Sequence, residues 1–134
     1  MKARVLLVSL LLWSGLLLAD DSQPSLTIET LVKQRIALLT QILEIAEKRY
    51  HAGGITEEQF LNATIDLYAL KRDSAKIPAE QVSWQERIVA VERQKKASLE
   101  KQMSVGTAGV VDVLRASERV LAAEQKQLEL QAAK

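Results

Sequence analysis

The chain has 134 residues, a length that suits one small domain, and carries 18 basic against 17 acidic residues. A protein that binds nucleic acid needs a basic face, so this balance argues against nucleic acid as a partner. The absence of cysteine excludes disulfides and thiol catalysis. Aromatic residues are scarce, whereas Ala, Leu, Glu, Lys and Gln are abundant, which is typical of an all-α protein with long helices.

Residues 1–19 have the layout of a secretory signal peptide. Lys2 and Arg4 precede an apolar run over residues 5–18, and Ala19 stands before two acidic residues, at a suitable cleavage point. The run is shorter than the ~20 apolar residues that span a bilayer, and an uncleaved membrane anchor is the alternative. Cleavage would remove Lys2 and Arg4 and leave 16 basic and 17 acidic residues. We therefore expect a secreted protein that meets a membrane only if this peptide is retained.

A leader at residues 20–25 precedes the first helix, whose periodicity begins near Leu26. Apolar residues form a seam with alternating steps of three and four. The seam consists of Val32, Ile36, Leu39, Leu43, Ala46 and Tyr50. A second stripe beside it consists of Leu31, Leu38, Ile42 and Ile45. Two adjoining stripes make a wide apolar face, so we expect this helix to touch more than one neighbour.

Gly53 and Gly54 end the first helix, and Gly53 is expected to take the left-handed conformation of a C-terminal cap. Thr56 then begins the second helix, and Gln59 three residues later completes a capping box. The apolar residues of this helix are Phe60, Ala63, Leu67 and Leu70, flanked by Leu61, Ile65 and Tyr68.

The second helix should end around residues 73–77, because Pro78 disfavours helical conformation at Ile77 and suits the first turn of a third helix. The third helix, over about 78–104, is the weakest amphipath, since Lys95, Lys96 and Glu100 interrupt its apolar face. We expect Trp84 to pack near the bend at Ile77 and Pro78.

A second glycine bend over residues 106–109 leads to a fourth helix that runs from about Val110 almost to the end. Gly109 stands where Thr56 stood, so this helix has the weaker cap unless Thr107 serves. The expected seam consists of Leu114, Leu121 and Leu128, with Val113 and Val120 beside it.

The second half of the chain repeats the first. A shift of 53 positions places residues 33–81 on 86–134 without a gap, and eight positions are then identical. The pairs are Ala37 and Ala90, Gln41 and Gln94, Glu47 and Glu100, Lys48 and Lys101, Gly53 and Gly106, Leu61 and Leu114, Ala63 and Ala116, and Ala69 and Ala122.

Such a repeat predicts one α-hairpin used twice, over residues 26–77 and 78–134. The expected fold is an up-down-up-down four-helix bundle, with both glycine bends at one end. The alternative is an extended pair of antiparallel coiled-coil hairpins that close only on dimerisation.

The first bend reads RYHAGGITEEQFLNA over residues 49–63, and the second reads QMSVGTAGVVDVLRA over 102–116. This doubled motif resembles the periplasmic part of the TolC family of outer-membrane efflux proteins. In that family the glycine lies at the periplasmic tip of an α-hairpin, where the hairpins of adaptor proteins dock. Family members are several times longer, and no alternating segments like their membrane-spanning strands stand in this sequence. The resemblance therefore implies a free-standing tip unit in the periplasm.

The resemblance makes the two bends the candidate partner-contact surface, with an adaptor hairpin or a second copy of the chain as the partner. Its residues are Tyr50, His51, Gly53, Gly54, Ile55, Met103, Val105, Gly106 and Thr107. Tyr50 and Met103 have a second interpretation, which we favour, as residues that pack across each bend onto Phe60 and Val113.

No catalytic or metal-binding constellation stands in the sequence. His51 is the single histidine, and Glu44 and Glu47 could share its helix face, but a metal site prefers more nitrogen or sulfur ligands. Asp66, Asp73 and Asp112 are expected to be solvated or paired, as Asp66 with the nearby Lys71 or Arg72. The glycines follow helices rather than strands, so capping explains them and not phosphate binding.

We expect a non-enzymatic periplasmic interaction protein without cofactor or metal, accessory to envelope transport. The alternative is a periplasmic helper in envelope stress that holds unfolded chains or senses a metal through its helical surface.

Overall fold

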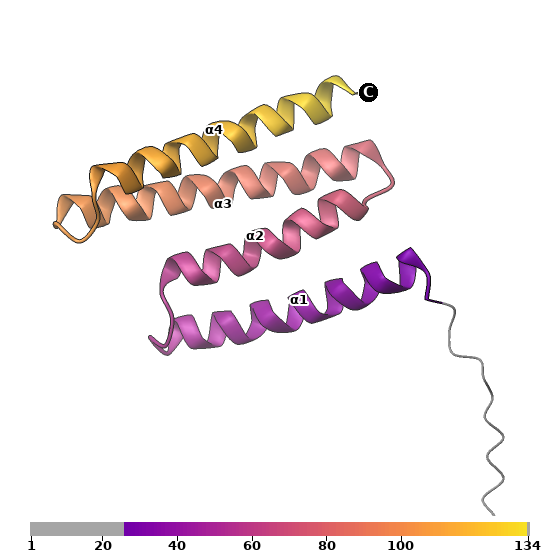
Figure 1. Ribbon diagram of the computed structural model, residues 1–134, viewed down its shortest axis with the longest axis horizontal. Coiled ribbons are helices and arrows are strands. Elements are labelled where there is room, and N and C mark those ends of the chain that lie inside the picture. The colour runs from indigo at the N-terminus through magenta and orange to yellow at the C-terminus, as the bar shows by residue number, and fades with distance from the viewer. Residues whose placement is uncertain (1–25, 134) are drawn as a thin grey trace, which may run out of the picture.

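The computed structural model describes residues 26–133 and contains four helices. They are α1 (Ile28–His51), α2 (Glu57–Ser74), α3 (Pro78–Ser104) and α4 (Val110–Ala132). Successive helices run antiparallel, so that both glycine bends lie at one end (Figure 1). The all-α class and the up-down-up-down order are thus confirmed. The expected signal peptide at 1–19 and leader at 20–25 lie outside the described residues.

Local signals set most helix ends. Thr27 caps α1, because its side chain accepts a hydrogen bond from the N–H of Thr30 over 3.1 Å. Pro78 occupies the first turn of α3, with Ile77 as an extended N-cap residue before it. The second helix ends at Ser74, within the region where its end is predicted.

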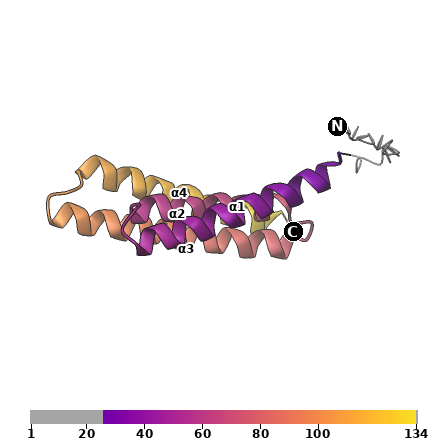
Figure 2. The same cartoon turned by 90° about the horizontal axis from the view of Figure 1, so that it is seen from below.

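The four helices form one open layer. Within residues 26–133, each helix contacts only its neighbours in sequence, and α1 makes no contact with α4. Figure 1 shows the helices side by side in the order α1 to α4, and Figure 2 views the same layer from below, with α1 nearest. The chain therefore adopts the extended arrangement of two hairpins, with α1 and α4 as its edges.

The buried core lies along the inner helices. Ile88, Val89 and Ala123 form its central cluster, and Ile65 packs against it from α2. The other residues of α2 that pack there are Tyr68 and Ala69. Leu61, Leu67 and Leu70 of α2 are also buried, because this helix has a neighbour on each side. Burial at the layer's centre leaves the two edge helices less covered.

The predicted seam of α4 is wrong. Leu121 is 65% exposed, and Leu114 and Leu128 are exposed as well, whereas Ala116 is fully buried. The stripe that faces α3 consists of Val113, Ala116, Val120 and Ala123. Both stripes are apolar, but α4 has a single neighbour in the chain and can cover only one of them.

The expectation that α1 touches more than one neighbour is also wrong within this chain. Its seam from Val32 to Tyr50 is half-buried, with Ala46 buried, as predicted. The second stripe stays exposed, because α1 lies at the edge of the layer and contacts α2 alone. Its members are Leu31, Leu38, Ile42 and Ile45.

Polar side chains occupy the buried face of α3. Gln85 is 1% exposed; it accepts a hydrogen bond from Arg72 Nη1 over 2.6 Å, and its Nε2 donates to the Ala123 carbonyl oxygen over 2.8 Å. This side chain thus joins α2, α3 and α4. Trp84 is half-buried and packs on Tyr68, with ring centroids 5.4 Å apart. The amphipathic pattern of α3 is therefore weak because this helix contacts two neighbours and makes some of these contacts through polar side chains.

Candidate functional site

Both glycine bends have the same backbone geometry. Gly53 and Gly106 have φ of 72° and 78°, and within residues 26–133 no residue other than glycine has a positive φ. The N–H of Gly54 donates to the carbonyl oxygen of Arg49 over 2.7 Å, and that of Thr107 donates to Gln102 over 2.9 Å. These bonds define a Schellman motif in each copy. The prediction that Gly53 holds the left-handed position is confirmed.

The caps that follow the two bends differ. Thr56 and Gln59 form the predicted capping box, with hydrogen bonds of 3.0 and 3.2 Å. In the second copy, Gly109 has no side chain to contribute, and only the reverse bond is made, from its N–H to Asp112 Oδ2 over 3.0 Å. Thr107 does not cap α4, because its hydroxyl donates back to the Gln102 carbonyl oxygen over 3.0 Å. The second bend is therefore the more weakly capped.

Tyr50 packs across the first bend. Its ring stacks on Phe60 with centroids 5.3 Å apart and planes tilted by 6°. The same ring lies 5.6 Å from the ring of His51. The favoured interpretation of Tyr50 is thus confirmed. At the second bend the equivalent residue, Met103, is exposed, and Val113 is half-buried.

The second bend presents the more exposed apolar surface. Val105 is 70% exposed, and Gly106 and Thr107 are exposed beside it, whereas Ile55 of the first bend is half-buried. Figure 1 shows that the α3–α4 bend projects beyond the α1–α2 bend at the same end of the layer. The structure thus brings the predicted contact residues to one end of the layer. The two bends are offset along the helix direction, with the second bend further out.

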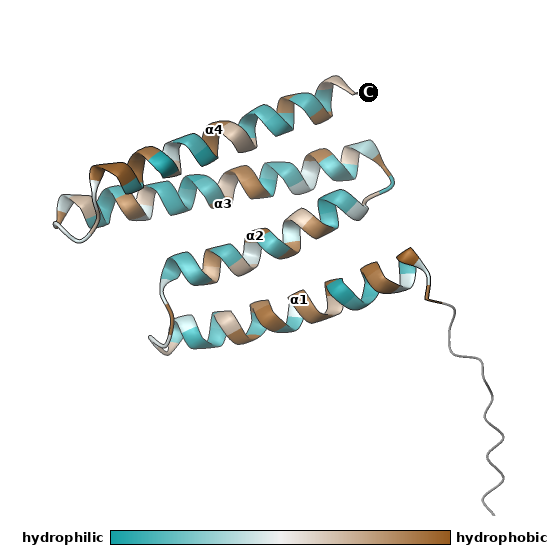
Figure 3. Ribbon diagram, in the orientation of Figure 1, coloured by the Kyte–Doolittle hydropathy of each residue, from teal (hydrophilic) through white to brown (hydrophobic). Residues whose placement is uncertain are grey.

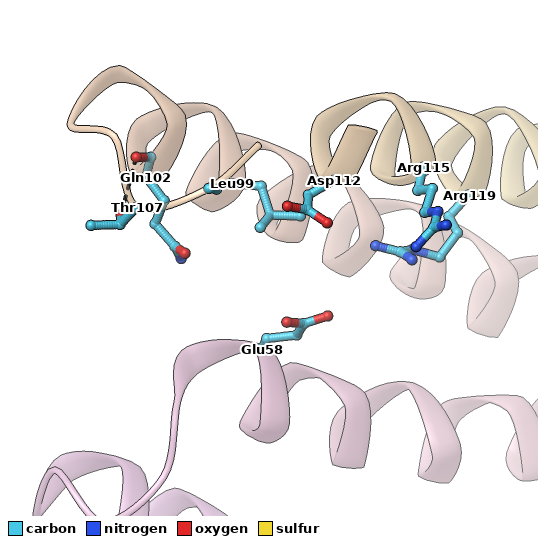
Figure 4. A pocket seen from close by; sticks show the side chains of 8 residues that line it. Glu58, Leu99, Gln102, Thr107, Asp112, Arg115 and Arg119 are labelled. Atoms are coloured by element: carbon cyan, nitrogen blue, oxygen red, sulfur yellow. Dashed lines mark hydrogen bonds between the residues drawn. The ribbon is translucent and has the colours of Figure 1, made fainter. Parts of the chain in front are cut away.

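A polar cleft of about 360 Å³ lies beside the second bend and was not predicted. Glu58 of α2 faces it from one side, and Arg115 and Arg119 of α4 face it from the other (Figure 4). The remaining lining residues are Leu99, Gln102, Thr107, Ala108 and Asp112. Carboxylate and guanidinium groups on opposite walls suit a polar, charged segment of a partner. Because the walls come from three helices, the sequence alone contains no signal for this cleft.

The wall of the cleft continues into a buried charged cluster. Glu92 Oε2 lies 3.7 Å from Lys95 Nζ and 3.7 Å from Arg119 Nε. Lys95 also donates to Asn62 Oδ1 over 2.6 Å. Glu92 and Lys95 are 8% and 5% exposed. The contact of Lys95 with Asn62 joins α3 to α2, and that of Glu92 with Arg119 joins α3 to α4, so we assign this cluster a structural role.

The acidic candidates and His51 are surface groups. His51 Nε2 lies 4.0 Å from Glu47 Oε1, and both side chains are largely exposed. Asp73 accepts a hydrogen bond from Arg72 Nε over 2.7 Å. The sequence suggested Arg72 as a partner of Asp66. In the structure Arg72 is instead bonded to Asp73 and Gln85.

No group of three or more His, Asp or Glu residues between 26 and 133 is placed to hold a metal ion. No helix in the same range is sufficiently long and apolar to cross a bilayer.

No protein-family model matches this sequence, and no curated protein or solved structure is significantly similar to it. The resemblance to the TolC family therefore depends on the doubled glycine motif alone and stays a prediction.

Proposed function

We propose that this chain is a non-enzymatic periplasmic interaction protein whose glycine bends dock on a helical hairpin of a partner protein. The observation that carries the proposal is the recurrence of one Schellman bend at the same end of the layer, with exposed Met103 and Val105 beside a polar cleft. Recurrent geometry with an exposed apolar tip favours contact with a partner over a purely structural turn.

The chemistry of this end fits a helical partner. Met103 and Val105 offer apolar contact, while Glu58, Arg115 and Arg119 in the cleft offer charge of both signs. An amphipathic helix presents the same combination, with apolar side chains next to charged ones at helical spacing. The apolar area of one tip is small, so one copy should bind weakly and several copies together should bind well.

Site-directed cross-linking tests the docking end. The chain has no cysteine, so single cysteines can be placed at His51 and Ser104 of the bends and, as matched controls, at Lys76 and Glu80 of the opposite end. All four positions are exposed in the free chain. In intact cells with the native envelope, we expect one and the same partner to be captured at both bend positions. Equal capture at the two ends would overturn the docking proposal.

One observation favours the alternative role as a holder of unfolded chains. A shallow apolar hollow of about 190 Å³ runs along α1, lined by Ile42, Ile45, Ala46, Arg49 and Ile55. Such a surface can bind apolar segments of a non-native protein. Suppression of the aggregation of a heated test protein, and its loss in Ile42→Asp, would support this role. A chain without any such activity leaves the docking proposal as the one to pursue.

A further inference from the structure

The two edge helices expose long apolar stripes. On α1 the exposed residues are Ile28, Leu31, Leu38, Ile42 and Ile45. On α4 they are Val110, Leu114, Leu121 and Leu128, the last three of them between 62% and 66% exposed. Figure 3 shows apolar segments recurring along both edges of the layer. Large apolar side chains in register along a whole helix exceed the scattered single residues that an ordinary surface carries, and they call for a covering partner.

The internal repeat relates the residues of these stripes to the residues that join α2 and α3. In the junction between α2 and α3, Trp84 packs on Tyr68 with centroids 5.4 Å apart. A shift of 53 positions carries Trp84 back to Leu31 of α1 and Tyr68 forward to Leu121 of α4. The exposed leucines therefore stand at positions that already form a helix–helix junction elsewhere in the same chain.

The correspondence holds near both ends of the junction. Gln81 donates to the Ala75 carbonyl oxygen over 2.8 Å, and Ser98 donates to Glu57 over 2.7 Å, near opposite ends of α3. Their equivalents are Ile28 with Leu128, and Ile45 with Val110. All four equivalents are apolar and exposed. At these two places the edges thus have apolar groups where the internal junction has polar ones.

We infer that a second copy of this chain covers these stripes. In the inferred interface, α4 of one copy packs antiparallel on α1 of the next, as α2 packs on α3 within the chain. The repeat identifies the second copy as the partner. It relates α4 to α2 and α1 to α3, and α2 packs on α3 within the chain, so the helix that fits the exposed stripe of α4 is an exposed α1.

The charges along the stripes favour packing of α4 on α1 over packing of α1 on α1 or of α4 on α4. Ile65 of α2 packs against the cluster that contains Ile88 of α3. The equivalents of this apolar pair are Glu118 and Arg35, both exposed and of opposite charge. Packing of α4 on α1 of another copy brings Glu118 next to Arg35. Packing of α1 on α1, or of α4 on α4, does not bring these opposite charges together.

The inferred interface has consequences for assembly. It joins two different surfaces, so an open series of copies retains a free α1 at one end and a free α4 at the other until the series closes on itself. Because α4 and α1 pack antiparallel, all copies point their glycine bends in the same direction. The assembly would gather several weak bends at one end, yet it forms whether or not those bends dock on another protein.

A charge swap in solution tests the inference. Protein produced from the full-length sequence is compared with Arg35→Glu, Glu118→Arg and the double variant by sedimentation at increasing concentration. We expect the parent to assemble, each single variant to dissociate with a dissociation constant raised at least about tenfold, and the double variant to regain assembly. A parent that remains a monomer at every concentration, or single variants that assemble like the parent, would overturn the inference.

Cross-linking then distinguishes the pairing. Leu31→Cys and Leu121→Cys are purified separately and treated with a short bismaleimide, alone and mixed. Cross-linked dimers in the mixture alone support the α4–α1 pairing, whereas dimers from either variant alone indicate a symmetric one and overturn it. Leu121 is exposed, so Leu121→Asp should keep its helical circular dichroism and lose assembly. If the parent does not assemble while cysteines at positions 51 and 104 still capture a partner, the inferred self-association is wrong and the docking proposal stands.

Discussion

The two hairpins share one backbone plan and differ in the chemistry of their seams. The seam of α1 that faces α2 contains Val32, Ile36, Leu39 and Leu43. The equivalent positions of α3, 53 residues later, hold Gln85, Val89, Glu92 and Lys96. The first hairpin is thus held by apolar contact, and the second is held partly by the buried hydrogen bond from Gln85 to Ala123 and the ion pair of Glu92 with Arg119.

This difference separates what forms a hairpin from what stabilises it. The Schellman bend recurs unchanged at Gly53 and Gly106, so the hairpin does not require an apolar seam. The polar seam of α3 has directional partners on both neighbouring helices, whereas an apolar seam tolerates small slips in register. We infer that polar groups in α3 fix the alignment of the two hairpins.

The largest expected effect is in the charged cluster of the second hairpin. Glu92→Ala leaves the 5% exposed Lys95 without its carboxylate and should lower the free energy of unfolding by about 3 kcal/mol or more. Transplanting the α1 residues, as Glu92→Leu with Lys95→Ile, removes both buried charges. The Arg119 side chain is 37% exposed and can reach water, so stability should recover to within about 1 kcal/mol of the parent. Urea denaturation measures both. A double variant as unstable as Glu92→Ala would show that the charges are needed as a pair.

Gln85 and its apolar counterpart Val32 give the next comparison. Gln85→Ala removes the buried hydrogen bonds that Gln85 makes with Arg72 Nη1 and with the Ala123 carbonyl oxygen, and should cost about 2 kcal/mol. Val32→Ala removes two carbons from a half-buried site and should cost about 1 kcal/mol. Thermal unfolding of the two variants ranks them. Val32→Ala as the more damaging change would contradict the role given to the polar seam.

The bends should respond alike because their geometry is alike. Gly53→Ala and Gly106→Ala should each cost about 1 kcal/mol, since both glycines have positive φ, and valine should cost more. A side chain at either position meets no atom within 4 Å, so the cost is conformational. Gly54→Ala is the matched control, because Gly54 lacks a positive φ, and its melting temperature should fall less. Equal losses at Gly53 and Gly54 would count against the assigned bend.

The caps offer a change in each direction. Thr56→Ala removes the capping hydroxyl from α2 and should cost about 1 kcal/mol. Gly109→Ser adds a hydroxyl at the N-cap of α4 and should stabilise by a few tenths of a kcal/mol, about the difference between the two residues at this position. Chemical denaturation resolves the first effect, and the second is sought in the melting temperature. No loss in Thr56→Ala would mean that the box is not needed.

The smallest effect concerns pH. A hydrogen bond from Lys33, its positive charge and that of Lys76 hold the pKa of Glu29 below its usual range. A carboxylate with a lowered folded-state pKa stabilises above its unfolded pKa, and this contribution is lost as pH falls through the folded value. Glu29 is exposed, so the contribution to stability should be small. Titration by NMR should show the low pKa, and Lys33→Met should raise it.

Helix ends could be predicted from the sequence because their causes are local. Thr56, Gly53 and Pro78 act on backbone groups within a few residues, so spacing alone identifies the capping box, the left-handed glycine and the start of α3. The stack of Tyr50 on Phe60 was predictable for the same reason, since the bend brings the two residues together.

Which apolar stripe is buried was decided by tertiary structure alone. Leu121 and Val120 are adjacent in the sequence and both apolar, yet Leu121 is exposed and Val120 is buried, because α4 has α3 on one side and no neighbour on the other. The polar cleft likewise required Glu58, Gln102 and Arg119 to meet from three helices. The spacing of apolar residues predicts that a helix has an apolar face. The number and position of its neighbours depend on how distant parts of the chain pack.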